Sequence, residues 1–158
     1  MKRLAIIADT GSPVAKAITE YFQNKNVELE LLTSVGSSNN YDLVACVHRR
    51  TDLPNAINIH ASLLPAFDTE SPVLDAFMHG VKVTGVTVHR AGGEIITQYP
   101  LLIGNLTHFD ELEGKITEIE KKIYPIVIEK VLNDEVFDFD DLWGGTGCGG
   151  CGGCKGCH

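Results

Sequence analysis

The fold is decided by the stretch Asn58-Ile59-His60-Ala61-Ser62-Leu63-Leu64-Pro65, in which a short apolar segment runs into a polar turn. Residues 56–60 have the composition of a buried strand, and side chains two residues apart on a strand project from the same face. Asn58 and His60 are therefore predicted to point to one side together. Because ligands of open α/β sheets gather at the carboxyl ends of parallel strands, the turn after His60 is the expected place for a binding site.

The flanking sequence supplies the rest of a sheet. Short apolar or alternating segments predict strands, and the Gly92-Gly93 turn between two of them predicts a hairpin. Because strands alternate with helices before this hairpin, we expect an α/β fold: a mostly parallel Rossmann-like sheet with helices on both faces and a late antiparallel hairpin. The expected strands cover residues 4–8, 27–33, 43–47, 56–60, 81–89 and 94–102.

Helices are expected over residues 13–22, 72–78 and 107–132. The first two follow a Ser-Pro pair, in which the serine hydroxyl caps a helix and the proline suits its first turn. In the third, Thr107 and Asp110 form an expected capping box. Pro125 is expected to kink or split this helix, because proline removes a backbone donor from the helix interior.

Length and composition suit one domain with an ordinary core, since 44% of the 158 residues are hydrophobic. Residues 1–136 are predicted to form that domain, 137–143 an acidic and aromatic connector, and 144–158 a Gly- and Cys-rich tail. The formal net charge of −8 argues against nucleic acid or an anionic membrane as the main partner, and no apolar run is long enough to span a bilayer. A small molecule is the expected partner and the cytoplasm the expected location.

The pair Asn58 and His60 suits acyl-transfer chemistry. A side-chain amide donates a hydrogen bond to an oxyanion as it develops, and an imidazole moves protons or adds positive charge. The same two residue types also occur as plain polar side chains at strand ends. The pair alone therefore leaves a catalytic and a structural interpretation open.

The surrounding sequence favours the catalytic interpretation. The stretch from Asn58 to Phe67 resembles the signature of the folate-dependent formyltransferases, with Ala61 where that family usually has proline. Residues 80–89, 93–98 and 123–128 resemble further blocks of the family in the same order. The resemblance spans roughly residues 1–136 and is greatest to the glycinamide ribonucleotide type. It implies the formyltransferase fold for this part of the chain.

The resemblance also implies an activity, transfer of a formyl group from 10-formyltetrahydrofolate as co-substrate to an amine. It assigns stabilisation of the tetrahedral intermediate to Asn58 and assistance with charge and proton movement to His60. His89 is expected to line the same pocket, or alternatively to be a buried structural histidine that donates to the backbone. The remaining expected pocket residues are Gly11, Ser12, Ser62, Leu63, Leu64, Thr87 and Glu94.

The chain departs from the family in its hairpin. The family carries a catalytic Asp on a loop between the two hairpin strands, whereas here His89-Arg90-Ala91-Gly92-Gly93-Glu94 joins the strands directly. Glu94 is the nearest carboxylate in sequence, and Asp68 and Glu70 are the other candidates. Catalysis without the full set rests on oxyanion stabilisation and positioning.

Two further departures concern the substrates. Asp9 and Pro13 replace a glycine and an asparagine of the family's phosphate-binding loop, which adds a negative charge and removes a backbone donor. Residues 36–40 and 48–55 replace longer segments that frame the folate pocket in the family. We therefore expect a substrate other than glycinamide ribonucleotide, or a relative that has lost catalysis and kept small-molecule binding.

The tail has no counterpart in the family. Its cysteines repeat every three residues among glycines, which suits chelation of a soft metal ion, and zinc or an iron–sulfur cluster is the expected cofactor. The alternatives are a thiol-rich tail without a metal, a redox element, or a segment recognised by another protein. Cys46 is instead expected to pack as a small apolar side chain. The predicted metal ligands are Cys148, Cys151, Cys154, Cys157 and His158.

Overall fold

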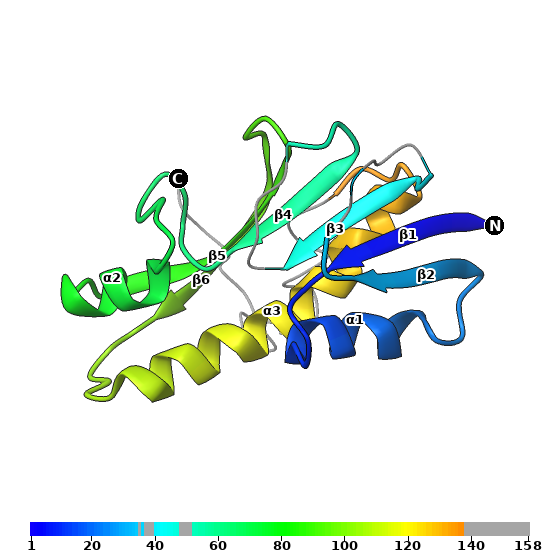
Figure 1. Ribbon diagram of the computed structural model, residues 1–158. Coiled ribbons are helices and arrows are strands. Elements are labelled where there is room, and N and C mark those ends of the chain that lie inside the picture. The colour runs from blue at the N-terminus through cyan, green and yellow to red at the C-terminus, as the bar shows by residue number, and fades with distance from the viewer. Residues whose placement is uncertain (35, 37–39, 48–51, 138–158) are drawn as a thin grey trace, which may run out of the picture.

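The computed structural model describes residues 1–34, 36, 40–47 and 52–137. Within them the strands form a single sheet in the order β2-β1-β3-β4-β5-β6 (Figure 1). The first four are parallel, and β5 runs antiparallel to both β4 and β6. The elements are β1 (Lys2–Ile7), α1 (Pro13–Phe22), β2 (Val27–Leu32), β3 (Leu43–Val47), β4 (Ala56–His60), α2 (Pro72–Met78), β5 (Val83–Arg90), β6 (Ile95–Leu102) and α3 (Phe109–Leu132).

This arrangement confirms the predicted α/β class, a mostly parallel sheet with a late antiparallel pair. Every residue of β3 and β4 is buried, as their continuous apolar character predicts. Cys46 on β3 is fully buried and packs among small apolar side chains, also as predicted. The site strand β4 therefore sits in the middle of the sheet, held on both edges.

The helices cover one face of the sheet. α1 and α3 lie side by side and share one large hydrophobic cluster with Leu4 and Ile6 of β1 (Figure 1). α2 contacts α3 near the far end, where the rings of Phe77 and Phe109 meet edge to face at 6.0 Å. The Tyr124 hydroxyl of α3 is fully buried and lies 2.8 Å from the carbonyl oxygen of Cys46 and 3.1 Å from that of Ile57. The long helix is thus fixed directly beneath β3 and β4.

The opposite face differs from the prediction of helices on both sides. It carries a smaller cluster that includes Ala5, Val44 and Cys46, and no helix in the described part of the chain contributes to it. Residues 33–42 and 48–55 connect β2, β3 and β4. The first link has 10 residues and the second has 8. A crossover that carries a helix takes at least about 10–12 residues, so the first link is at this minimum and the second is below it. The short links before and after β3 therefore limit how the second face of the sheet is covered.

The start and interior of α3 differ from the sequence prediction. The helix begins at Phe109, its N-cap is His108, and no side chain caps it, so the predicted capping box is wrong. Thr107 lies one residue before the cap and is out of position for that role. The helix also continues through Pro125 without being split. Buried neighbours such as Tyr124 and Val127 hold the segment against the sheet despite the missing donor.

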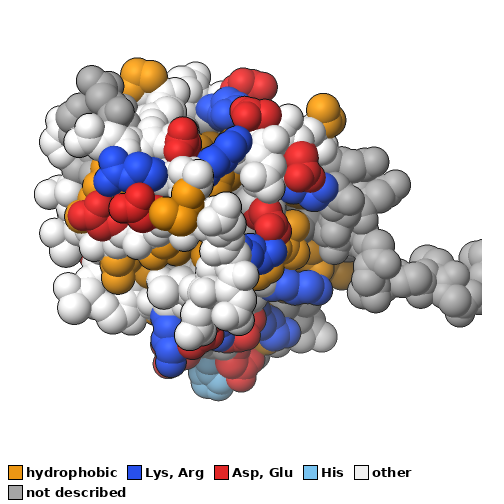
Figure 2. All heavy atoms as spheres, turned by 90° about the vertical axis from the view of Figure 1, so that its right-hand side faces the viewer, with side chains coloured by type: hydrophobic (Ala, Val, Ile, Leu, Met, Phe, Trp, Pro, Cys, Tyr) orange, Lys and Arg blue, Asp and Glu red, His pale blue; other side chains and the backbone are white. Residues whose placement is uncertain are grey.

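Charges of both signs alternate on the end of the molecule that carries the amino terminus (Figure 2). Lys25 lies 2.6 Å from Glu129, and Lys2 lies 3.3 Å from Asp134. Such exposed pairs contribute little to stability, but they leave this end without a patch of one sign. No helix within the described residues is long and apolar enough to cross a membrane.

Candidate functional site

Strand pairing brings the predicted site residues together. Asn58 on β4 pairs with His89 on β5, and His60 pairs with Thr87. Residues directly opposite each other on neighbouring strands project from the same face, so these four side chains form one row. All four are buried, with Asn58 1% exposed and His89 5% exposed. The predicted common orientation of Asn58 and His60 is thus joined by a second imidazole.

The turn after β4 is fixed to the hairpin by hydrogen bonds. The Thr87 hydroxyl donates to the Ser62 carbonyl at 2.6 Å and accepts from the Leu64 amide at 3.0 Å. The Gln98 side-chain amide donates to the Leu64 carbonyl at 2.9 Å. These hydrogen bonds form a clamp that positions the end of β4. The clamp is made by three of the predicted pocket residues, Ser62, Leu64 and Thr87. Gln98 completes this clamp and is a residue that the sequence analysis did not select.

Gly85 allows the same turn to pack closely against β5. A Cβ atom at this position would lie 2.2 Å from the Tyr99 carbonyl oxygen and 2.7 Å from Cδ2 of Leu63. Both distances are far below van der Waals contact, and the first involves backbone that cannot move aside. Leu63 thus reaches its place only because residue 85 has no side chain.

The same turn folds back to contact His60. The Nε2 atom of His60 lies 3.0 Å from the carbonyl oxygen of Phe67, which can only accept, so Nε2 carries the proton. In the neutral ring the lone pair is then on Nδ1. Phe67 adopts a positive φ of 50°, an unusual conformation for a bulky residue. The next residue is Asp68, one of the carboxylates considered as a replacement for the family's aspartate. Of these candidates it is the nearest in sequence to the contact between His60 and Phe67.

His89 has a defined tautomer as well. Its Nδ1 atom lies 3.0 Å from the Arg90 carbonyl oxygen and must donate, so in the neutral ring the lone pair is on Nε2. That Nε2 atom is buried and has no hydrogen-bond partner in the described structure. A buried acceptor left unsatisfied costs about 1–3 kcal/mol. The hydrogen bond from Nδ1 to the backbone is what a buried structural histidine would make. The unsatisfied Nε2 atom is not explained by that role and is what a pocket residue would present to a ligand.

The structure does not bring Glu94 to this site. β5 runs antiparallel to β4, so it moves away from His60 before the turn at residues 91–94. Glu94 is exposed beside Arg90, 3.8 Å from its Nε atom, and lines a separate cleft with the carboxyl end of α3. Strand direction therefore excludes it as a replacement for the family's aspartate.

Gly11 and Ser12 lie at the start of α1, where they shape the helix end. Gly11 has a positive φ of 80°, and the Ser12 hydroxyl caps the helix by accepting from the Ala15 amide at 3.3 Å. The Ser12 amide itself donates to the Asp9 carbonyl at 3.1 Å. Pro13 has no amide proton, so this helix start offers few free donors to an anion.

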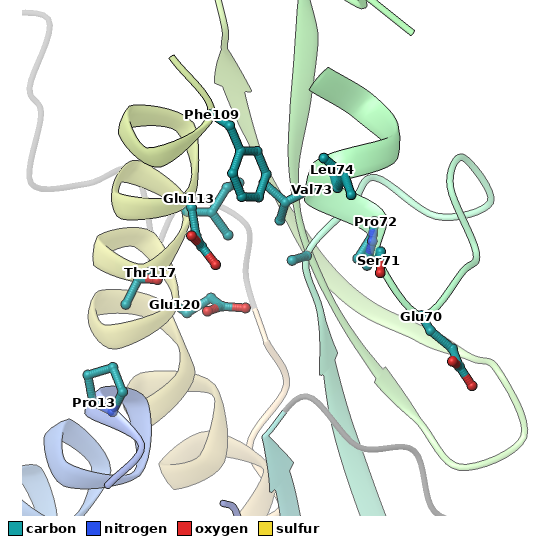
Figure 3. Close-up of a pocket in the computed structure, with 12 residues that line it drawn as sticks. Pro13, Glu70, Ser71, Pro72, Val73, Leu74, Phe109, Glu113, Thr117 and Glu120 are labelled. Atoms are coloured by element: carbon teal, nitrogen blue, oxygen red, sulfur yellow. The ribbon is translucent and has the colours of Figure 1, made fainter. Parts of the chain in front are cut away.

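A cleft of about 530 Å³ opens between α2 and α3 beside the end of β4 (Figure 3). Ala61, the residue after His60, forms part of its wall, and Pro13 contributes from the start of α1. Glu113 and Glu120 extend into it from α3, while Glu70 lies on the loop before α2 and points away from them. Ala61 packs with Ile57 and Ile59 in the hydrophobic cluster under α1 and α3, so the cleft lies on the helix face of the sheet, opposite the face from which Asn58 and His60 project.

Glu120 lines this cleft and is a buried carboxylate that the sequence analysis did not select. It is fully buried, and burial raises the pKa of its carboxyl group from 4.5 to about 8. A signal for it exists in the sequence. Glu120 occupies a position of the helical stripe otherwise formed by Leu112, Ile116 and Ile123, where an apolar residue is expected.

The predicted metal ligands Cys148, Cys151, Cys154, Cys157 and His158 lie outside the described residues. Within the described ranges there is no group of three or more side chains placed to hold a metal ion. The remaining cysteine, Cys46, is buried, and burial raises the pKa of its thiol to about 12. It is therefore not a reactive thiolate at neutral pH.

Comparison with known proteins bears on this site. Residues 8–128 match the family described as formyl transferase. The chain is 43% identical over 81 residues to phosphoribosylglycinamide formyltransferase of Bacillus subtilis, a match covering 48% of this chain and 42% of that protein. It is 37% identical over 84 residues to methionyl-tRNA formyltransferase of Thermotoga neapolitana, covering 50% of this chain and 27% of that protein.

Solved structures agree on the fold. Phosphoribosylglycinamide formyltransferase from Bacillus halodurans superimposes with a TM-score of 0.68 at 23% sequence identity, covering 87% of this chain and 100% of that one. The matched segments span less than half the length of the curated relatives. The family match nevertheless covers most of this chain, including β4, the hairpin and most of α3. The chain belongs to the formyl transferase family.

Proposed function

We propose that this chain transfers a formyl group from 10-formyltetrahydrofolate to an amine other than glycinamide ribonucleotide. The observation that carries the proposal is the shared orientation of Asn58 and His60 at the carboxyl end of β4, with His89 paired to Asn58. Membership of the formyl transferase family supports the reaction class. The changed acceptor is supported by the residues around the start of α1.

Each of the two central side chains has a chemical role in this proposal. The Asn58 amide donates to the formyl oxygen as negative charge develops there during attack by the amine. His60 holds its Nε2 proton on the Phe67 carbonyl, so its Nδ1 lone pair accepts the proton that the attacking nitrogen loses. The imidazolium then returns this proton to the folate nitrogen as its bond to the formyl carbon breaks. The products are a formamide and tetrahydrofolate.

The Nε2 atom of His89 needs a hydrogen-bond donor beside Asn58, and in this proposal a folate or an ordered water supplies it. Its buried Nε2 atom is an acceptor without a partner among the described residues. The pterin ring of a folate carries several N–H donors of the kind that such an acceptor requires. In this proposal His89 lines the co-substrate pocket and helps to orient the ring.

Glycinamide ribonucleotide is disfavoured as the acceptor because its phosphate would have little to bind. Of the amides at the start of α1, that of Ser12 is used by Asp9, that of Ala15 is used by the Ser12 hydroxyl, and Pro13 has none. The family's usual anion site at this helix end is thereby weakened.

Titration of the protein with tetrahydrofolate in a calorimeter tests the proposal. Saturable binding in the micromolar range, weakened about fivefold to tenfold in a His89→Asn variant that keeps its melting temperature, is the expected result. If tetrahydrofolate does not bind at millimolar concentration, the proposed reaction is excluded.

A second candidate is a non-catalytic relative that binds a small molecule. It is favoured by the direct hairpin turn at residues 91–94, which holds no carboxylate near His60. The two candidates differ in turnover. The enzyme forms a formylated amine, whereas the binding protein is stabilised by tetrahydrofolate and produces nothing.

We also propose that the carboxyl-terminal repeat binds a metal ion or an iron–sulfur cluster, with four evenly spaced cysteines and His158 as ligands. Purification under anaerobic conditions, followed by metal analysis of the full chain and of a chain ending at residue 143, tests this. Metal in the full chain only is expected. Equal metal content in both proteins would remove the tail as the site. The four cysteines are Cys148, Cys151, Cys154 and Cys157.

A further inference from the structure

We propose that His79, at the end of α2, is a positioning residue for the candidate site and acts through Phe67 on His60. Its ring holds Phe67 in place, and the Phe67 carbonyl oxygen in turn fixes the ring and the proton of His60. This gives His60 a fixed hydrogen-bond acceptor in a chain whose hairpin turn brings no carboxylate to it. The inference rests on the proposed formyl transfer, because it names a residue that serves the same site.

Phe67 is held in a conformation that it would not adopt by itself. Its φ of 50° lies in the left-handed region, which bulky residues rarely occupy. Such a conformation persists only where the surrounding structure enforces it, and it is typical of functional sites. The carbonyl oxygen of this same residue lies 3.0 Å from Nε2 of His60. Whatever holds Phe67 therefore also determines where the acceptor for His60 lies.

Two sets of contacts hold Phe67. Within the turn, the Ser62 hydroxyl lies 2.6 Å from the Ala66 carbonyl oxygen and 3.4 Å from that of Phe67. Outside the turn, the rings of Phe67 and His79 have centroids 5.3 Å apart and planes tilted by 59°. Ser62 is fully buried, whereas His79 is exposed. His79 is therefore the contact that can be changed without opening the core.

His79 is itself fixed to α2. It is the C-cap residue of that helix, and its Nδ1 atom lies 2.8 Å from the Asp75 carbonyl oxygen, to which it must donate. The side chain of Asp75 accepts a hydrogen bond from the hydroxyl of Thr69, which lies two residues beyond Phe67. The helix is thus tied to the segment after β4 at two points. A continuous series of contacts runs from α2 through Phe67 to His60.

The orientation of the His60 ring decides whether it can act as the proposed base. The hydrogen bond made by one ring nitrogen sets the protonation of the other, so a fixed acceptor at Nε2 keeps Nδ1 available for the proton of the attacking amine. Misplacement of a catalytic group by about 1 Å can lower a rate about 100-fold. Loss of the His79 ring should therefore slow the transfer step and leave co-substrate binding nearly unchanged.

NMR of the histidine ring protons in the 15N-labelled full chain tests the inference without requiring activity. His60 and His89 each donate one ring proton to a backbone carbonyl, and only the acceptor of His60 contacts His79. In His79→Ala, exchange of the His60 Nε2 proton with water should accelerate about tenfold, as expected for one lost hydrogen bond, while the His89 Nδ1 proton exchanges as before. His79→Phe restores a ring beside Phe67 and should bring the His60 rate to within about threefold of the wild type.

The matched control is His108→Ala, because His108 is also an exposed histidine at a helix end and makes no capping hydrogen bond there. It should leave both exchange rates unchanged. Unchanged exchange at His60 in His79→Ala, or no recovery in His79→Phe, would overturn the inference. Equal acceleration at His60 and His89 would also overturn it, because that result indicates a general loss of stability.

The kinetic consequence of His79→Ala is a selective loss of turnover. The variant should lower kcat for formyl transfer about tenfold to a hundredfold, with KM for 10-formyltetrahydrofolate within about twofold of the wild type. A raised KM with unchanged kcat would contradict a positioning role. Absence of transfer by the wild type would instead exclude the proposed function and would leave the exchange result standing, so the two failures are distinguishable.

Discussion

Asn58 on β4 lies directly opposite His89 on β5, which places a side-chain amide donor and an imidazole acceptor on the same face of the sheet. The Nδ1 proton of His89 is donated to the Arg90 carbonyl, so in the neutral ring its Nε2 atom can only accept. This relationship gives the site a second imidazole on the strand next to β4. It arises from antiparallel pairing and is independent of the loop that carries the family's aspartate.

The Nε2 atom of His89 can be tested with two complementary variants. His89→Asn keeps a donor close to Nδ1 but removes the acceptor, and His89→Gln places an amide oxygen close to Nε2. We expect His89→Asn to weaken tetrahydrofolate binding about fivefold to tenfold and His89→Gln to restore part of that loss, since one hydrogen bond contributes about 1 kcal/mol. Calorimetry measures both, with melting temperatures as the control for folding. Unaltered affinity in His89→Asn would leave the residue a purely structural role.

The clamp formed by Thr87 gives a prediction about stability. Thr87→Val removes the hydroxyl that bonds Ser62 and Leu64, leaving buried polar groups unsatisfied, and should lower the free energy of unfolding by about 2 kcal/mol. Thr84 is the matched control on the same strand, because its hydroxyl is buried and has no hydrogen-bond partner in the described structure. Thr84→Val should be neutral or stabilising. Urea unfolding of both variants checks the difference, and equal losses would show that the clamp contributes nothing specific.

Glu120 predicts how stability depends on pH. Burial raises the pKa of its carboxyl group to about 8 from 4.5, so the folded state binds more protons than the unfolded state between those values. The free energy of unfolding should therefore fall as the pH rises from about 5 to about 8, by an amount on the order of 3 kcal/mol from this group. Glu120→Gln should remove most of this decline, and Glu111→Gln should preserve it. Urea unfolding at pH values in this window measures both, and an unchanged slope in Glu120→Gln would contradict the assignment.

The sequence predicts well where composition alone determines an element. β3 and β4 follow from continuous apolar residues, and the shared face of Asn58 and His60 follows from the two-residue period of a strand. The order of the elements predicts helices on both faces of the sheet. That order carries no information about whether the links between strands are long enough to hold a helix.

Features that depend on register could not be predicted. The pairing of Asn58 with His89 is set by the alignment of two strands, and a bulge between Val88 and His89 shifts the register with β6. Glu94 is close to His89 in sequence, yet the direction of β5 carries it to the far end of β4. Glu120 is different, because a carboxylate at an apolar position of the helical stripe is visible in the sequence itself.

The central claim is that Asn58 and His60 move a formyl group to an amine, and product formation tests it most directly. The protein is mixed with 10-formyltetrahydrofolate carrying a radiolabelled formyl group and with a panel of primary amines, and labelled formamide is measured. The account predicts a formylated amine, with the rate lowered about 10²–10³-fold in Asn58→Leu, as expected when an oxyanion donor is removed, and abolished in His60→Ala. Binding of tetrahydrofolate without any labelled product, or equal rates in the wild type and Asn58→Leu, would contradict it.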